Sequence, residues 1–148
     1  MSGPVGETRP TTVWVLGDQL DRSLGALAAA RPDTHRVLLV EGRHLLERRR
    51  WHRQRAHLVI TSMRRFARAL EADGFTVDHQ VAPTVAAGVR AHIEAHAPAA
   101  VLVTEPNSRA GRRVADAVGA TQVRSDQFLC HHEEFATWAR GRRSLRME

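Results

Sequence analysis

The sequence predicts a single α/β domain with a doubly wound, five-stranded parallel sheet and helices on both faces. Two patterns indicate this fold. Short apolar segments alternate with amphipathic segments five times along the 148 residues, and the apolar segments are nearly continuous, as in parallel strands buried on both faces. Right-handed crossovers between such strands place the helices on both faces. We expect the domain at residues 11–140, after a flexible leader at 1–10 and before a short arginine-rich tail at 141–148.

Strands are predicted where β-branched and apolar runs end in turn residues. They are expected at residues 11–17, 36–42, 75–81, 99–106 and 121–126, in the spatial order 3-2-1-4-5. Helices are predicted between them from apolar residues at helical spacing. They are expected at residues 23–30, across 56–70, after the N-cap Thr84, at 109–118 and at 133–140. The basic segment 43–55, which contains Trp51, is interpreted as a solvated loop, with a nucleic-acid contact as the alternative.

Charge and composition exclude several classes of protein. The formal net charge of +6 favours polyanionic partners. All 22 lysine and arginine positions are arginine, which is typical of a GC-rich genome, so charge alone supports nucleic-acid binding only weakly. Because Cys130 is the single cysteine, this chain alone forms no disulfide, four-cysteine zinc site or cysteine-ligated cluster. No apolar run approaches the roughly 20 residues of a membrane span, and no signal peptide is visible, so we expect a cytoplasmic protein without a membrane partner.

Three predicted strands end in an acidic residue, namely Asp18, Glu41 and Glu105. In the order 3-2-1-4-5 these strands are neighbours, and parallel sheets bind ligands beyond the carboxyl ends of their strands. Carboxylates there accept hydrogen bonds from ring N–H groups or from polyol hydroxyls, which predicts a ligand crevice. The alternative is that each acid only caps the helix that follows it.

Common catalytic and cofactor motifs are missing from the sequence. The first strand–helix turn, GDQLDRSLG, has neither of the glycine patterns that hold a dinucleotide or a triphosphate, and no GxSxG or HExxH motif occurs. His131 and His132 are adjacent and are expected to point apart, so no metal site is predicted. The chain on its own is therefore not predicted to be a catalyst, and a ligand without phosphate fits best.

Four segments in sequence order resemble one known family. VLGDQL (15–20), HRQRAHLVITSMRRFARAL (52–70), VTEP (103–106) and RSDQFLCHHEEFATWARGRRSLRME (124–148) are similar to the N-terminal domain of the deoxyribodipyrimidine photolyase-related proteins. These are bacterial cryptochromes and (6-4) photolyases, DNA-repair lyases that also carry an iron–sulfur cluster. The resemblance extends over residues 13–148.

The resemblance implies a Rossmann-like domain that binds a light-harvesting chromophore, usually 6,7-dimethyl-8-ribityllumazine. In the family this pigment lies at the carboxyl ends of the strands and passes excitation energy to a flavin in a helical domain. The chromophore-binding residues that it implies are Gly17, Asp18, Gln19, Leu20, Glu41, Thr104 and Glu105. The sequence of residues 40–46 differs from the one usual in the family, because it is richer in arginine.

The family also implies a partner for this chain. Its members continue into a linker, a helical flavin domain and four cluster-binding cysteines, so FAD and the iron–sulfur cluster are expected to be absent here. The chain is then a fragment or a split subunit whose partner is a flavin-binding catalytic domain, and it meets DNA only indirectly. The alternatives are a photolyase assembled in trans, and an arginine-rich nucleic-acid-binding module.

Overall fold

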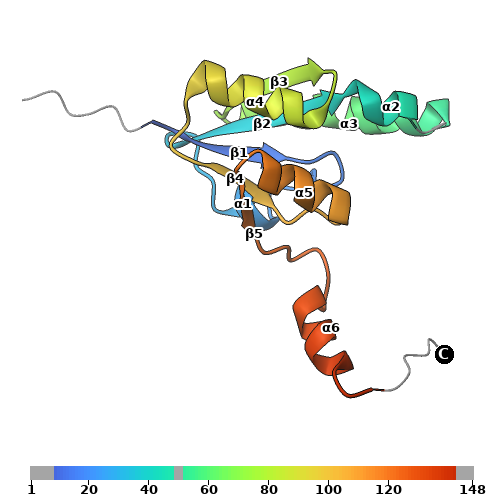
Figure 1. Ribbon diagram of the computed structural model, residues 1–148. Helices are drawn as coiled ribbons and strands as arrows, with labels where there is room; N and C mark the ends of the chain where they lie inside the picture. The colour runs from blue at the N-terminus through green and yellow to red at the C-terminus, as the bar shows by residue number, and fades with distance from the viewer. Residues whose placement is uncertain (1–8, 49–51, 143–148) are drawn as a thin grey trace, which may run out of the picture.

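The computed structural model describes residues 9–48 and 52–142, and its centre is a five-stranded sheet (Figure 1). The strands are β1 (Thr11–Val15), β2 (His35–Gly42), β3 (Thr76–Ala82), β4 (Val101–Thr104) and β5 (Thr121–Val123). All pairs are parallel and the spatial order is β3-β2-β1-β4-β5, which confirms the predicted topology. Residues 1–8 of the predicted leader (1–10) and residues 143–148 of the predicted tail (141–148) lie outside the described residues.

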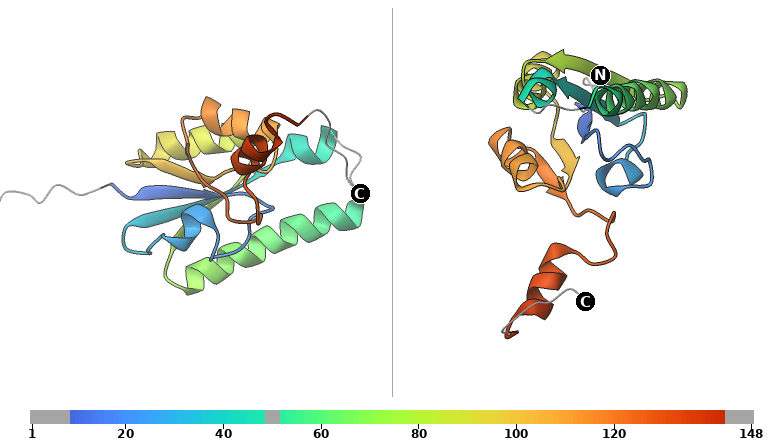
Figure 2. Two further views of the ribbon diagram at one scale, coloured as in Figure 1. Left: turned by 90° about the horizontal axis from the view of Figure 1, so that it is seen from below. Right: turned by 90° about the vertical axis from the view of Figure 1, so that its right-hand side faces the viewer.

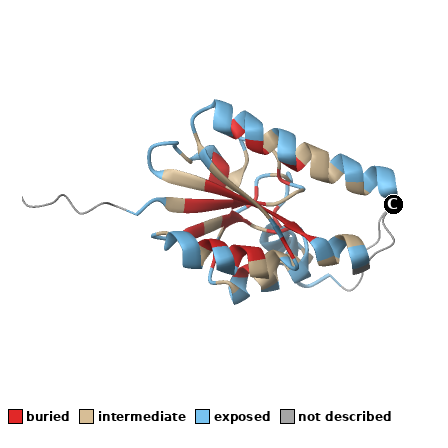
Figure 3. Cartoon of the chain, turned by 90° about the horizontal axis from the view of Figure 1, so that it is seen from above, coloured by how far each residue is buried: buried red, intermediate tan, exposed pale blue. Residues whose placement is uncertain are grey.

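Helices cover both faces of the sheet, as predicted. They are α1 (Gly25–Ala28), α2 (Arg43–Arg48), α3 (Arg53–Ala72), α4 (Val85–His96), α5 (Arg109–Ala117) and α6 (His132–Ala139). Side chains alternate along each strand. Val13 and Leu39 therefore pack with α1 and α3 on one face, whereas Trp14 and Leu38 pack with α4 and α5 on the other. The buried residues concentrate in the central strands and on the inner helix surfaces (Figure 3).

Several predicted elements are shorter than expected. The first helix is only the four residues of α1 rather than 23–30, and β4 covers Val101–Thr104 rather than 99–106. Apolar composition indicates where a strand lies, but the strand ends where its neighbour stops pairing. Thr84 is the N-cap of α4, as predicted, since its side chain accepts a hydrogen bond from the Ala87 N–H.

The interpretation of residues 43–55 as a loop is wrong for most of the segment. Residues 43–48 form α2, and Arg53 begins α3. Arg43–Arg48 contains leucine, glutamate and arginine without glycine or proline, and these residues favour a helix. Trp51, on which the nucleic-acid alternative depended, lies outside the described residues. None of the described helices is long and apolar enough to span a membrane.

A buried polar network joins α4 to the sheet on the face covered by α4 and α5. His92 is fully buried, and its Nδ1–H donates to Asp78 Oδ2 at 2.6 Å. Its Nε2 accepts from the hydroxyl of Thr12, also fully buried, at 2.8 Å. Burial lowers the pKa of His92 from its ordinary value, although the hydrogen bond to Asp78 acts in the opposite direction. The imidazole is therefore held neutral.

This network predicts acid destabilisation that begins near neutral pH. The pKa of His92 is lower in the folded than in the unfolded chain, so below about pH 6.5 the unfolded state binds more protons. The contribution of neutral His92 to the free energy of unfolding is therefore complete above that pH, and it decreases as the pH falls towards the folded pKa. Urea unfolding between pH 7 and 5, with an NMR titration of the His92 ring, measures both quantities. Constant stability over this range, with His92 titrating at or above 6.5, would contradict the assignment.

Candidate functional site

The loop after β1 brings Asp18 and Gln19 to the carboxyl edge of the sheet. Asp18 is exposed, and one oxygen of its carboxylate accepts from Asn107 Nδ2 at 3.2 Å. Gln19 is 4% exposed, and its Nε2 donates to the backbone oxygen of Glu105 at 2.9 Å. Its Oε1 is buried and receives no hydrogen bond from any residue that the structure describes. The loop therefore offers one exposed carboxylate and one unpartnered buried acceptor.

Gly17 and Leu20 fix this loop from either side of the two polar residues. A Cβ on Gly17 would lie 3.1 Å from Sδ of Met63, so the small residue lets the backbone approach α3 closely. Leu20 packs against the core on the face covered by α1 and α3. Both residues position the loop.

Glu105 lies directly after β4 and holds the segment that follows β5. Its Oε2 accepts from His131 Nε2 at 2.7 Å and from the Ser125 N–H at 3.1 Å. Burial raises the pKa of Glu105, but these hydrogen bonds outweigh it and hold the pKa below its usual range. Glu105 is therefore an ionised anchor between β4 and the segment of residues 124–131.

Glu41 and Thr104 are bound to neighbouring elements. Glu41 is still inside β2. Its carboxylate accepts hydrogen bonds from Nε and Nη2 of Arg64, both at 2.9 Å, and its Oε1 lies 2.8 Å from Nε2 of His79. Burial raises the pKa of Glu41, but Arg64 and His79 hold it below its usual range. Thr104 Oγ1 accepts from the Ala26 N–H and fixes α1. The ligand-binding role of Glu41 and Thr104 stays a prediction.

Two amide side chains that the sequence analysis did not select complete the edge. Asn107 Nδ2 bridges Asp18 Oδ2 and Gln127 Oε1, both at 3.2 Å. Gln127 Nε2 donates to the backbone oxygen of Asp18 at 3.1 Å. Gln127 lies in the segment 124–148, which contributed to the family resemblance but supplied none of the predicted chromophore-binding residues.

Neither Asp18 nor Glu105 caps the following helix, because Leu24 and Ser108 occupy the N-cap positions.

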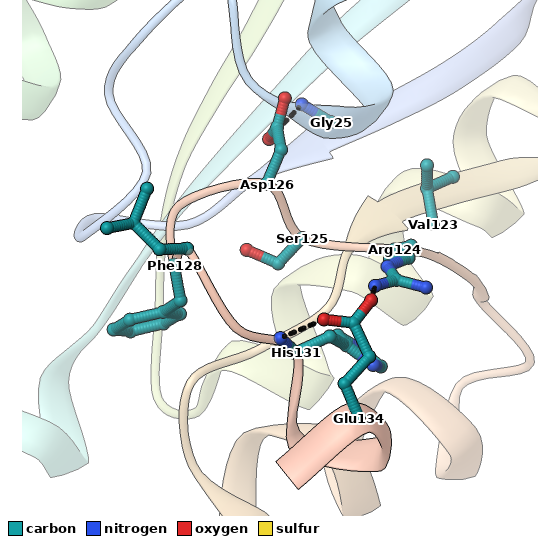
Figure 4. Close-up of a pocket in the computed structure, with 9 residues that line it drawn as sticks. Gly25, Val123, Arg124, Ser125, Asp126, Phe128, His131 and Glu134 are labelled. Atoms are coloured by element: carbon teal, nitrogen blue, oxygen red, sulfur yellow. Dashed lines mark hydrogen bonds and ion pairs between the residues drawn. The ribbon is translucent and has the colours of Figure 1, made fainter.

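A hollow of about 400 Å³ lies beside this edge, between α1 and the segment after β5 (Figure 4). Its size is within the usual range for small-molecule sites. Asp126 crosses its rim to accept from the Gly25 N–H at 3.2 Å, and Phe128 and His131 line it. None of the seven predicted chromophore-binding residues is among its described lining residues.

The expectation that His131 and His132 point apart is wrong. Their ring centroids are 4.1 Å apart, because His131 is the extended N-cap of α6 and His132 its first helical residue. Both nitrogens of His131 are in use, since Nε2–H donates to Glu105 and Nδ1 accepts from the Glu133 N–H at 3.4 Å. In this arrangement His131 has no free lone pair for a cation. The absence of a metal stays a prediction.

The fold defines a class of protein, the Rossmann-like α/β proteins with a parallel sheet and helices on both of its faces. Comparison with known proteins is more specific. Residues 13–148 match the family model described as deoxyribodipyrimidine photo-lyase-related protein, and the chain belongs to this family. It is 31% identical, over an alignment 148 positions long, to a (6-4) photolyase from Agrobacterium fabrum. The alignment covers 92% of this chain but only 29% of that photolyase.

Proposed function

We propose that this chain is the chromophore-binding domain of a photolyase-related protein and that it binds 6,7-dimethyl-8-ribityllumazine. The proposal rests on the buried Oε1 of Gln19, which has no hydrogen-bond partner among the described residues, next to the exposed carboxylate of Asp18. A buried acceptor without a donor costs stability, so such groups mark places where a donor is expected. The bound lumazine would supply light absorption and transfer of excitation energy to a flavin held elsewhere.

The acceptors at this edge fit the chemistry of a ribityllumazine. Carboxylate and amide oxygens only accept hydrogen bonds, and the ligand offers a ribityl chain of hydroxyl donors. It carries no phosphate, so a domain without a glycine-rich phosphate loop suits it. Asp18 and Gln19 would bind the donors directly, whereas Asn107 and Gln127 hold Asp18 in position.

The same proposal assigns photochemistry to another part of the protein. Flavin-dependent repair needs the flavin itself. The proposal assigns the flavin site to a part of the protein outside this chain, which aligns with 29% of the Agrobacterium photolyase. This domain's contribution is to hold the pigment in a fixed orientation.

Titration with 6,7-dimethyl-8-ribityllumazine tests the proposal. We expect saturable binding to the wild-type chain, and Asp18→Ala should weaken it about 10- to 100-fold, since a hydrogen bond to a charged group contributes about 1.5–3 kcal/mol. Asp33→Ala is the matched control, because Asp33 is exposed before β2, at the opposite end of the strands, where it pairs with Arg31. Ligand fluorescence and equilibrium dialysis measure the dissociation constants. Absence of saturable binding, or equal weakening by both variants, would reject the proposal.

A further inference from the structure

The segment after β5, residues 124–142, is called the C-terminal arm here, and it carries an unusual share of exposed apolar surface. Seven large apolar side chains are exposed in the described residues, and four of them lie in this arm. They are Phe128 (62% exposed), Leu129 (fully exposed), Phe135 (49%) and Trp138 (53%). The end of the arm, α6, has no buried residue and lies away from the layered sheet (Figures 1 and 2). The arm thus presents an apolar surface that the described domain does not cover.

The base of the arm is fixed by polar contacts. Glu105 holds His131, Asp126 binds the Gly25 N–H, and Arg124 pairs with Glu134. A reciprocal capping box between His131 and Glu134 defines the start of α6. The contacts with Glu105 and Gly25 therefore join the base of the arm to the domain, whereas Phe135 and Trp138 on α6 are exposed.

The exposed aromatic residues of α6 form a pair with adjacent positive charge. The ring centroids of Phe135 and Trp138 are 5.6 Å apart, and the Arg142 guanidinium lies 3.9 Å from the Trp138 ring centroid. Aromatic residues and arginine are enriched at protein–protein interfaces, and exposed apolar patches often mark such interfaces. A second copy of this chain is disfavoured as occupant, because pairing two arms would bring Arg142 and the net charge of +6 of each copy together.

We propose that the apolar surface of the C-terminal arm docks on the remaining part of a photolyase-related protein, in an apolar groove with an acidic rim. The family match includes the whole arm, and the chain covers 29% of the Agrobacterium photolyase, so the relative has a large remainder available for this contact. This inference rests on the proposed function for the identity of the partner. It goes further by assigning the contact to Phe135 and Trp138. Because Gln127 also contacts Asp18, the docked arm would join the partner to the pigment edge.

Hydrogen exchange in a chimera tests the docking. The chimera is the Agrobacterium (6-4) photolyase with its aligned segment replaced by this chain, and the comparison is the isolated full chain. Amides of residues 128–139 should exchange at least 10-fold more slowly in the chimera. Phe135→Ser with Trp138→Ser should abolish that slowing, whereas Leu58→Ser, which changes an exposed leucine on α3, should not. Equal exchange in the chimera and in the isolated chain would overturn the proposal.

Two measurements on the isolated chain test the same proposal independently. The double variant should leave the urea midpoint of the isolated chain unchanged, because both aromatic side chains are exposed in it. A lowered midpoint would show that the aromatic pair packs on its own domain. Sedimentation should give a monomer, and a dimer lost in the double variant would make a second copy the occupant and overturn the proposal. Lumazine binding is measured separately. Binding without protection of the arm rejects only the docking, and protection without binding rejects only the pigment.

Discussion

Replacing His92 with leucine should lower the free energy of unfolding by about 2–4 kcal/mol, because two hydrogen-bonding partners are left unsatisfied and each such group costs roughly 1–3 kcal/mol. Leucine fills a similar volume, so the loss comes from the polar groups and not from a cavity. It leaves the hydroxyl of Thr12 buried without its partner and removes the N–H donor from the carboxylate of Asp78. Urea unfolding at pH 7.5, where His92 is neutral, measures the change.

Thr12→Val separates the two halves of this network. On its own it removes one hydrogen bond and should cost about 1 kcal/mol. Combined with His92→Leu it removes the stranded hydroxyl as well, so the double variant should be less destabilised than the sum of the two single changes. Strict additivity, or a loss below about 1 kcal/mol for His92→Leu, would show that the network contributes little to stability.

Gly25→Ala should destabilise the fold by about 2–4 kcal/mol, from backbone strain and the loss of one hydrogen bond together. Gly25 begins α1 with φ of +46°, a conformation that L-residues avoid. A Cβ there would lie 2.4 Å from Oγ1 of Thr104, the atom that accepts the Ala26 N–H. The new methyl group must therefore displace the Thr104 side chain, which breaks its hydrogen bond with the Ala26 N–H and loosens α1 from β4. Thermal or urea unfolding measures the loss.

Gly119→Ala is the matched control for that change. Gly119 has φ of +72°, but a Cβ there would meet no atom within 4 Å. It measures the backbone cost alone, which is roughly 1–2 kcal/mol. Adding Thr104→Ala to Gly25→Ala should recover part of the difference, because the smaller side chain leaves room for the methyl group. Equal losses for the two glycine variants would mean that the contact with Thr104 is unimportant.

The sheet was predictable because its determinants are local. Val37–Val40 is a continuous apolar run, and Val13–Val15 is another, so both strands indicate burial on two faces. The alternation of strands and helices with right-handed crossovers then leaves few topologies, and 3-2-1-4-5 is the observed one. Element ends were less predictable. Val15 ends β1 although Leu16 and Gly17 continue its apolar composition, because pairing with β2 stops there.

The site was predictable in part. Asp18, Gln19 and Glu105 meet at one edge because β1 and β4 are neighbours, which follows from topology. The environment of Glu41 did not follow, since its ionic partners Arg64 and His79 come from α3 and β3. Strand alternation could have placed Glu41 on the same face as Leu39, the face that α3 covers, but the position of Arg64 on that helix depends on tertiary packing.

The most direct test of the account is NMR mapping of the lumazine site on the isolated chain. Titration with 6,7-dimethyl-8-ribityllumazine should shift the backbone amides of Asp18 and Gln19, and the side-chain amide signals of Gln19, Asn107 and Gln127. The side-chain signals matter most, because the Oε1 of Gln19 is the acceptor left without a donor in the described residues. Shifts confined to α3, or to the hollow between Val123 and Glu134, or no shifts at millimolar ligand, would contradict the assignment of the pigment to this edge of the sheet.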